Sequence, residues 1–346
     1  NVLIGNKSGY TNLSSNIVAV GNQSGYMNNS AIKNTYIGHN SGYNNNTGVC
    51  NTYLGNYSGY STTSSSASYN IAIGNEAGYS ITSAARNVLI GSTKSASETS
   101  NDAAGWSLQN GTDNIHIGTN SGASATSTIN NVLIGSDVGT SIITAGNNVL
   151  IGKNTGNAIN SLGENIVIGA DSGTSTSTGS ALIIGKSAGV GYTGQYAYSL
   201  GNNSGKNILG TSNMFLGYNS GGGQPVDSKT GSYNLAIGPY SGFNLSTGSR
   251  NVLIGSGNSI NSVGIVISTG SDNTILGYSA GSQIQGGSNN TLIGSNSGAT
   301  LTSGVNNLIL GYNSAFTLNT GSNNVSLGPY SGYKLTSGSG NIFSGF

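Results

Sequence analysis

The chain has 346 residues and a formal net charge of +1, and only 5% of its residues are charged, whereas an average soluble protein has about 25%. This composition excludes a nucleic-acid-binding protein, which needs a basic surface, and it argues against a disordered chain, which combines low hydrophobicity with high net charge. The 58 glycines do not recur at every third position, which excludes collagen, and no apolar stretch reaches the roughly 20 residues of a membrane span.

The first predicted element is the apolar run Val2-Leu3-Ile4, which continues into Gly5-Asn6-Lys7-Ser8-Gly9. A strand that leads into a glycine loop with a lysine and a hydroxyl resembles the start of a phosphate-binding loop. In the following copies of the motif, however, Lys7 is replaced by Gln23, Asn40, Tyr57 and Glu76. A phosphate would have no consistent partner there, so we interpret the motif as a structural unit.

The same motif recurs along the whole chain. Aligned on the glycine that ends each apolar run, eleven of the nineteen intervals are 17 residues long and four are 16. We number repeat positions from this glycine, so that the apolar run occupies positions −3 to −1. Such regularity predicts one continuous repeat region over residues 1–346, expected to be a segment of a longer fibre protein. The aligned glycines are Gly5, Gly21, Gly38, Gly55, Gly74, Gly91, Gly118, Gly135, Gly152, Gly169, Gly185, Gly201, Gly217, Gly238, Gly255, Gly277, Gly294, Gly311, Gly328 and Gly345.

Each apolar run is short, rich in Val, Ile and Leu, and bounded by Gly, Asn and Ser, which is typical of a strand and not of a helix. A second apolar position follows at +7, for example Ile81, Leu245 and Leu318. Two short strands and two glycine turns per repeat would form one coil. The sequence therefore predicts an all-β, parallel β-solenoid with about twenty coils.

Stacking of the coils would place equivalent residues about 4.8 Å apart along the solenoid axis. Asn occupies position −4 in seventeen copies, which predicts a ladder of side-chain amides. Tyr10, Tyr26, Tyr43, Tyr60 and Tyr79 all occupy position +5, which predicts an aromatic ladder. Glycines at positions 0 and +4 predict corners with positive φ.

The middle residue of each run should point opposite to its two neighbours. If the neighbours fill the coil, the middle residues form an outward stripe, which is often large and apolar, as at Leu3, Tyr36, Leu133 and Phe343. This stripe is larger than a soluble monomer usually exposes. We therefore predict an intertwined or side-by-side homo-oligomer; the alternative is a wide coil whose own loops cover the strands.

No catalytic residue, cofactor or metal site is predicted, and the chain is expected not to be an enzyme. Asp137 and Asp171 share a repeat position, but they lie two coils or about 9.6 Å apart, against roughly 6.5–9.5 Å for the carboxylates of an inverting glycosidase. His39 falls at a corner and His116 at a middle position expected to face outward, and neither has an aligned carboxylate or cysteine. Cys50, the single cysteine, cannot form an intrachain disulfide.

The longest interval, between Gly91 and Gly118, contains the only tryptophan, Trp106, together with Asp102 and Gln109. Loops on a rigid scaffold commonly carry recognition. We therefore predict that this loop recognises a cell-surface receptor or a glycan. The alternative is that Trp106 seals its own loop against the coil.

The segments Asn70-Ile71-Ala72-Ile73-Gly74 and Asn234-Leu235-Ala236-Ile237-Gly238 resemble the Asn-x-Ala-Ile-Gly head repeats of trimeric autotransporter adhesins. The longer unit Asn307-Leu308-Ile309-Leu310-Gly311-Tyr312-Asn313-Ser314-Ala315 resembles more closely the repeats of phage tail-fibre and bacterial surface-fibre proteins. The resemblance implies a fibre on a virion or cell surface, with three copies around one axis.

The expected function is therefore structural: an extracellular or virion-borne fibre segment that provides reach, rigidity and attachment. One alternative is a solenoid lectin or carbohydrate-active enzyme that uses the aromatic ladder or the inserted loops. Another is an ice- or surface-binding solenoid, which the irregular loops disfavour.

Overall fold

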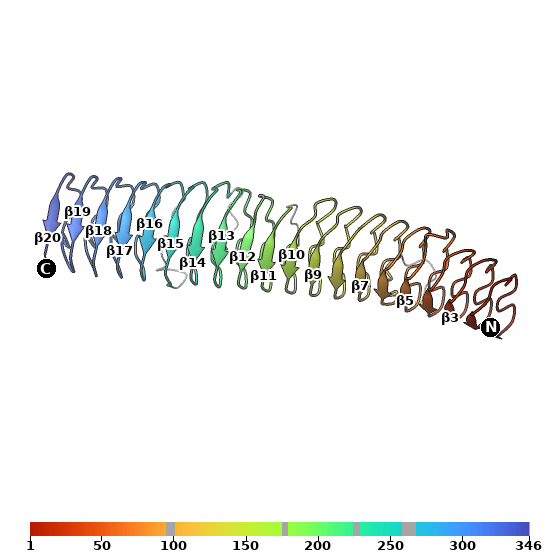
Figure 1. Cartoon of the computed structure of the whole chain (residues 1–346). Coiled ribbons are helices and arrows are strands. Elements are labelled where there is room, and N and C mark those ends of the chain that lie inside the picture. The colour runs from red at the N-terminus through yellow and green to blue at the C-terminus, as the bar shows by residue number, and fades with distance from the viewer. Residues whose placement is uncertain (95–100, 175–178, 224–228, 258–267, 346) are drawn as a thin grey trace. The chain divides into compact units, whose positions relative to one another are not determined.

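The computed structural model describes residues 1–94, 101–174, 179–223, 229–257 and 268–345 (Figure 1). Within these residues the protein is all-β, and twenty three-residue strands are assigned to one parallel sheet of a β-solenoid. Each strand occupies repeat positions −3 to −1, as the apolar runs predict. The strands are β1 Val2–Ile4, β2 Val18–Val20, β3 Thr35–Ile37, β4 Thr52–Leu54, β5 Ile71–Ile73, β6 Val88–Ile90, β7 Ile115–Ile117, β8 Val132–Ile134, β9 Val149–Ile151, β10 Ile166–Ile168, β11 Leu182–Ile184, β12 Tyr198–Leu200, β13 Met214–Leu216, β14 Leu235–Ile237, β15 Val252–Ile254, β16 Thr274–Leu276, β17 Thr291–Ile293, β18 Leu308–Leu310, β19 Val325–Leu327 and β20 Ile342–Ser344.

Backbone contacts divide the chain into a first unit, residues 1–179 with β1–β10, and a second unit, residues 180–346 with β11–β20. Within each unit every strand pairs in parallel with the next strand of the chain, and equivalent repeat positions lie opposite each other. In the first unit Leu133 lies opposite Leu150, and in the second Phe215 lies opposite Ala236. The predicted parallel β-solenoid with one coil per repeat is thus confirmed.

The prediction of two strands per coil is wrong. In the described residues, the side of the coil opposite the strands contains turns, joined by isolated bridges such as Ala85–Thr112 and Ile208–Lys229. Residues at positions −5 and +2 adopt positive φ, for example Asn130 (φ 59°) and Lys7 (φ 54°). A residue with positive φ cannot continue a strand. The segment between these two positions, which includes the predicted second strand at position +7, therefore forms turns, and each coil keeps one short strand.

The predicted orientation of the strands is also wrong. From β2 to β19 the middle residue is buried, and the flanking residues are exposed or partly exposed. Tyr36 and Leu133 are 0% exposed and lie in the core, whereas Leu54 and Leu216 in flanking positions are each 41% exposed. The coil is narrow, so one inward residue per strand fills it and the flanking residues face out.

The residue at position +7 completes the core of each coil. In the examples below its size compensates for that of the middle strand residue at position −2. Tyr36 is combined with Asn45, whose Nδ2 donates to the phenol oxygen at 2.5 Å. Where the middle residue is as small as Ala72, the +7 residue is Ile81, and both are 0% exposed. The interior volume therefore stays similar from coil to coil, as close packing requires.

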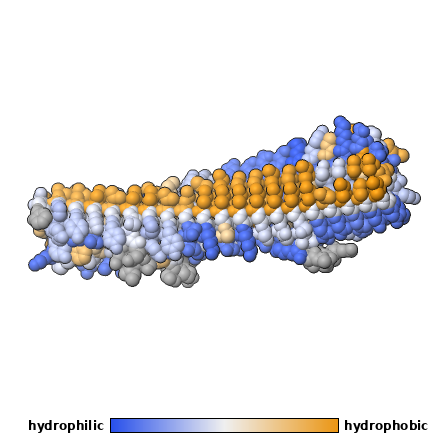
Figure 2. All heavy atoms as spheres, turned by 90° about the horizontal axis from the view of Figure 1, so that it is seen from below, coloured by the Kyte–Doolittle hydropathy of each residue, from blue (hydrophilic) through white to orange (hydrophobic). Residues whose placement is uncertain are grey.

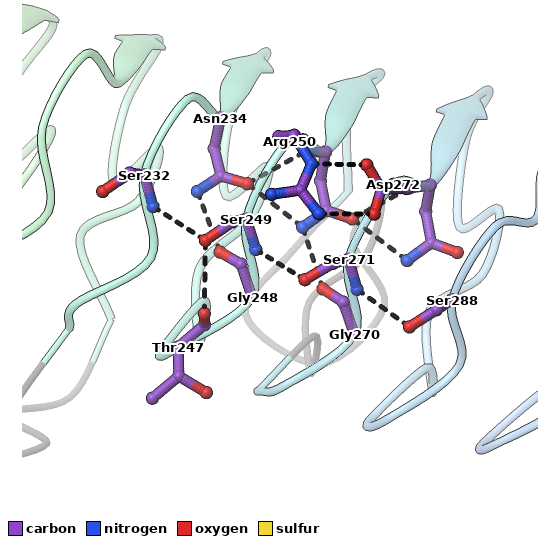
Figure 3. Close-up of polar contacts among 12 residues, drawn as sticks. Ser232, Asn234, Thr247, Gly248, Ser249, Arg250, Gly270, Ser271, Asp272 and Ser288 are labelled. Carbon is purple, nitrogen blue, oxygen red and sulfur yellow. Dashed lines mark hydrogen bonds and ion pairs between the residues drawn. The ribbon is translucent and has the colours of Figure 1, made fainter.

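The predicted asparagine ladder is confirmed and is buried beside the strands. The backbone N–H and Nδ2 of Asn251 each donate to Oδ1 of Asn234 at 3.0 Å, and Nδ2 also donates to the Gly270 carbonyl at 2.9 Å (Figure 3). Serine forms a parallel ladder in the neighbouring turn, where the Ser249 N–H donates to Oγ of Ser271 at 3.0 Å (Figure 3). Side chains of each coil therefore form hydrogen bonds with buried polar groups of the adjacent coil.

The corner glycines at position 0 are required both by conformation and by space. Gly5 has φ +133°, and a Cβ atom there would lie 2.3 Å from the carbonyl oxygen of Gly21. Lys7, two residues later, has its Nζ 6.0 Å from the centroid of the Tyr10 ring. The opening motif thus forms a corner that stacks on the next corner.

Candidate functional site

The aromatic residues at position +5 of the first unit form a continuous stack. Tyr10, Tyr26, Tyr43, Tyr60 and Tyr79 follow one another with ring centroids 5.0, 4.8, 5.2 and 5.1 Å apart and interplanar angles of 10°, 3°, 22° and 18°. The predicted tyrosine ladder is therefore confirmed. We call this stack, with the residue that ends it, the aromatic ladder.

Trp106 ends the aromatic ladder. Its ring stacks on Tyr79 at a centroid distance of 5.3 Å and an angle of 6°. The regular coil resumes at Asp102, since the Asn120 N–H donates to the Asp102 carbonyl at 2.7 Å just as the Gln23 N–H donates to that of Asn6. The repeat is therefore regular from residue 102 onward, and Trp106 belongs to the coil.

The three residues of the predicted recognition site lie on one coil, at positions equivalent to +1, +5 and +8. Oδ1 of Asp102 accepts the Lys94 N–H at 3.2 Å, and Gln109 is exposed. Trp106 is half-buried, and its Nε1 has no hydrogen-bond partner among the described residues. Among the described residues, no hydrogen bond or ring contact joins the side chains of Asp102, Trp106 and Gln109. Their role in recognition stays a prediction.

Stacking limits what the aromatic ladder can bind. Both faces of Tyr26, Tyr43, Tyr60 and Tyr79 are covered by neighbouring rings, so only their edges and hydroxyl groups can face solvent. A sugar ring binds to an aromatic side chain through the face, which is unavailable here. Each stacked pair instead adds about 0.5–1.5 kcal/mol to the cohesion of neighbouring coils.

Two exposed ion pairs join successive coils at position −5. Arg86 binds Asp113 through two hydrogen bonds of 2.7 and 2.8 Å, and Arg250 binds Asp272 through two of 2.6 and 2.8 Å (Figure 3). The guanidinium hydrogen bonds lower the pKa of both carboxyl groups. These carboxylates are held ionised by cations, which suits them to link coils and not to transfer protons.

Asp137 and Asp171, which share a repeat position, have separate hydrogen-bond partners. Asp137 accepts hydrogen bonds from Lys94 and from Nδ2 of Asn120, the latter at 2.8 Å, and Asp171 accepts one from Nδ2 of Asn154 at 3.0 Å. Partial burial would raise the pKa of Asp137, but its hydrogen bonds hold it below the ordinary value. Among the described residues no group of three or more His, Cys, Asp and Glu side chains could hold a metal ion.

His116 is fully buried, which corrects the prediction that it faces outward. It occupies the middle of β7 between Leu89 and Leu133, and neither ring nitrogen has a hydrogen-bond partner among the described residues. Burial lowers the pKa of His116 from 6.5 to about 3. The imidazole is therefore a neutral core residue at neutral pH. His39, in contrast, lies at a corner, as predicted, and is exposed.

We expect His116 to make the first unit sensitive to acid. Its pKa is lowered in the folded state, so the unfolded chain binds an additional proton between pH 6.5 and about 3. The free energy of unfolding should then fall by about 1.4 kcal/mol per pH unit below pH 6.5, before most carboxylates titrate near pH 4. Urea unfolding from pH 7 down to about pH 4.5 measures this slope.

His116→Leu should remove that slope and stabilise the unit at neutral pH, because Leu fits the same position in β6, β8 and β9. His39→Asn is the control and should keep the slope, and Leu133→His should increase it. An unchanged slope in His116→Leu would contradict the assignment.

Lys229 is a buried cation that the repeat pattern did not reveal. It is 1% exposed, and its Nζ donates to the carbonyl oxygens of Gly221 at 3.2 Å and Gly223 at 3.3 Å. Burial lowers its pKa to about 8. Lys229 pairs with Ile208 of the preceding coil and so occupies the core position that Ile208 and Leu245 occupy in the neighbouring coils. Its ammonium group hydrogen-bonds the turn at residues 221–223 from this position.

The outward residues at positions −3 and −1 form an apolar surface that we call the strand face. Figure 2 shows this surface as a band of hydrophobic side chains along the strands. Position −1 is Ile, Leu or Val in nineteen of the twenty strands. Side chains exposed by 37% or more include Ile37, Leu54, Ile71, Ile166, Ile184, Met214, Leu216, Leu276, Ile293 and Leu308.

The fold and its ladders define the chain as a β-solenoid repeat protein. No protein-family model matches the sequence, and no curated protein or solved structure matches it. In the part of the chain that the structure describes, no helix is long and apolar enough to cross a membrane.

Proposed function

We propose that the chain is a structural segment of an extracellular or virion-borne fibre that self-associates through the strand face, and that it is not an enzyme. The observation that carries this proposal is the continuity of the strand face over successive strands of each unit (Figure 2). About twenty side chains per unit, each partly exposed, add up to on the order of 1,000 Å², against roughly 300–600 Å² for the largest apolar patch of a typical monomer.

The chemistry of the coils supports a mechanical role. Asparagine, serine and aromatic ladders and Arg–Asp pairs all join one coil to the next. A quasi-one-dimensional stack of this kind gains stability with every neighbour interface. Reach and rigidity are the properties that such a construction supplies.

Another copy of the chain is the occupant that the strand face fits best. The face repeats with the strand spacing of about 4.8 Å, so a partner that matches it over many strands must have the same repeat. The strands also carry no Lys, Arg, Asp or Glu at positions −3 and −1, so no charge opposes close approach. Three copies around one axis would bury each strand face, as the resemblance to trimeric fibres implies.

Native mass tests this proposal. Sedimentation equilibrium of the chain should give a multiple of its 34.5 kDa mass, with three copies expected. The double substitution Met214→Lys and Leu216→Lys places two charges on the strand face and should release monomers or smaller assemblies while the coil remains folded. Electron microscopy should show rods for the unsubstituted protein.

The matched control is Asn202→Lys with Tyr218→Lys, which adds the same charge at exposed positions off the strand face and should leave the mass unchanged. A monomer at all concentrations, or an assembly that both double variants retain, would refute self-association through this face.

A further inference from the structure

The second unit has gaps in the row of side chains that forms the aromatic ladder in the first unit. Phe316, at position +5, stacks on Tyr333 of the next coil at 5.5 Å and 13°. On its other side the preceding coils carry Ala299 and Ser282 at the same position. One face of the Phe316 ring is therefore left without an aromatic neighbour, in contrast to the rings inside the aromatic ladder.

A cleft of about 250 Å³ occupies this gap. Phe316 forms one end, and the small side chains of Ala299 and Ser282 form part of its lining. Polar groups surround them, since Gln283, Asn296 and Thr300 also line the cleft. We call this cleft slot A.

A second cleft, slot B, of about 300 Å³ is built from the same repeat positions. Its end is Phe243, and the preceding +5 positions carry Gly222 and Lys206 in place of Ala299 and Ser282. Position +2 supplies Asn203 and Asn219, as it supplies Ser279 and Asn296 in slot A. The two clefts lie at equivalent repeat positions. In both, the +5 residue is small in one coil and aromatic in the next, and we infer that this combination forms the slot.

The groups around each slot are suited to recognise hydroxyl groups. Among the described residues, the side chains of Gln283, Asn203 and Asn219 make no hydrogen bond, and each carries both a donor and an acceptor. Asn296 donates through Nδ2 to Oδ1 of Asn313 at 3.0 Å, which fixes its amide and leaves its own Oδ1 as an acceptor. An aromatic face with a few polar groups around it is typical of a small-ligand site.

We propose that slots A and B each bind one pyranose ring of a glycan. The apolar C–H face of the sugar would lie on Phe316 or Phe243, and its hydroxyl groups would bond to the amides at positions +2 and +6. Slot A, which no charged side chain lines, fits a neutral sugar. Slot B contains Lys206 and fits a sugar with a carboxylate, such as a uronic acid.

An aromatic side chain of a protein partner could also stack on Phe316 or Phe243 in the slot. It would, however, leave the surrounding amides next to an apolar ring and without hydrogen bonds. Buried polar groups left unpaired oppose binding. A pyranose satisfies both the ring face and the amides, so we favour the glycan.

Saturation-transfer NMR on the full chain tests slots A and B with D-galactose, N-acetyl-D-glucosamine and D-glucuronate as probes. Transfer to at least one neutral sugar and to glucuronate is expected. Ala299→Tyr should complete the stack on Phe316 and reduce neutral-sugar binding by about tenfold or more. Lys206→Gln should reduce glucuronate binding and leave neutral-sugar binding at slot A unchanged.

Tyr10→Ala, in the filled ladder of the first unit, is the control and should bind all probes as the unsubstituted chain does. Circular dichroism distinguishes loss of the slot from loss of the fold in every variant. The proposal is overturned if no probe receives saturation, if Ala299→Tyr binds neutral sugars normally, or if only a tryptophan- or tyrosine-containing peptide binds. It does not depend on self-association, which the mass of the assembly tests separately.

Discussion

Gly135→Ala should unfold the coils around β8 and lower the free energy of unfolding by about 4 kcal/mol or more, an effect at the upper end for single substitutions. Gly135 has φ +134°, and a Cβ atom would lie 2.3 Å from the carbonyl oxygen of Gly152. The obstacle is the backbone of the next corner. It is held by the hydrogen bond of 2.9 Å from the Gly152 N–H to the Ile134 carbonyl and cannot move away without breaking this bond.

Gly286→Ala is the matched control. Gly286 does not have positive φ, and the nearest atom to its added Cβ, Oγ1 of Thr269, lies at 3.4 Å. Alanine there should be neutral or stabilise slightly by restricting the unfolded chain. Denaturant unfolding compares the two variants, and hydrogen exchange should locate the loss of protection in Gly135→Ala on both sides of β8. Equal stability of the two would contradict the corner argument.

Asn131→Ala should destabilise the first unit by about 3–5 kcal/mol, because it leaves several buried groups without partners at about 1–3 kcal/mol each. Oδ1 of Asn131 accepts from the N–H and Nδ2 of Asn148, both at 3.0 Å. Its Nδ2 donates to Oδ1 of Asn114 at 3.2 Å and to the Ala145 carbonyl at 2.9 Å. The substitution breaks the ladder in both directions from one position.

Asn160→Ala removes an exposed asparagine from the same unit and should change stability by no more than about 0.5 kcal/mol. The measurement is urea unfolding at pH 7, with hydrogen exchange at the amide of Asn148 as the local readout. A cost for Asn131→Ala as small as that of the control would show that the amide ladder contributes little.

The repeat, the parallel solenoid, the asparagine ladder and the tyrosine ladder could all be predicted from the sequence, because each depends on spacing alone. The direction of the strand residues was predicted wrongly, although the sequence carries a signal for it. Asn at −4 and the middle residue at −2 have the same parity and must point to the same side. A ladder of side-chain amides that bond to one another is expected in the interior of the coil. Leu133, which points to the same side as Asn131, is therefore expected in the interior as well.

Two other features were not predicted, for different reasons. Trp106 appeared to belong to an inserted loop, but Ala104-Gly105-Trp106 matches Ser8-Gly9-Tyr10 and could have been aligned with it. Slots A and B could not be predicted in the same way. Their repeat positions can be read from the sequence, but their volume depends on how far neighbouring side chains extend into the gap.

The parallel register has a consequence for how such a chain can change in length over evolution. Loss or gain of one residue inside a strand or corner would put that repeat out of line with its two neighbours, whereas intervals of 16 and of 21 residues both leave the strands in register. Loss or gain of a whole repeat preserves all contacts at the junction, and after the longest interval the register resumes at Asp102. Duplication of whole coils is therefore the change that selection can use to adjust the length of the protein, in steps of about 4.8 Å.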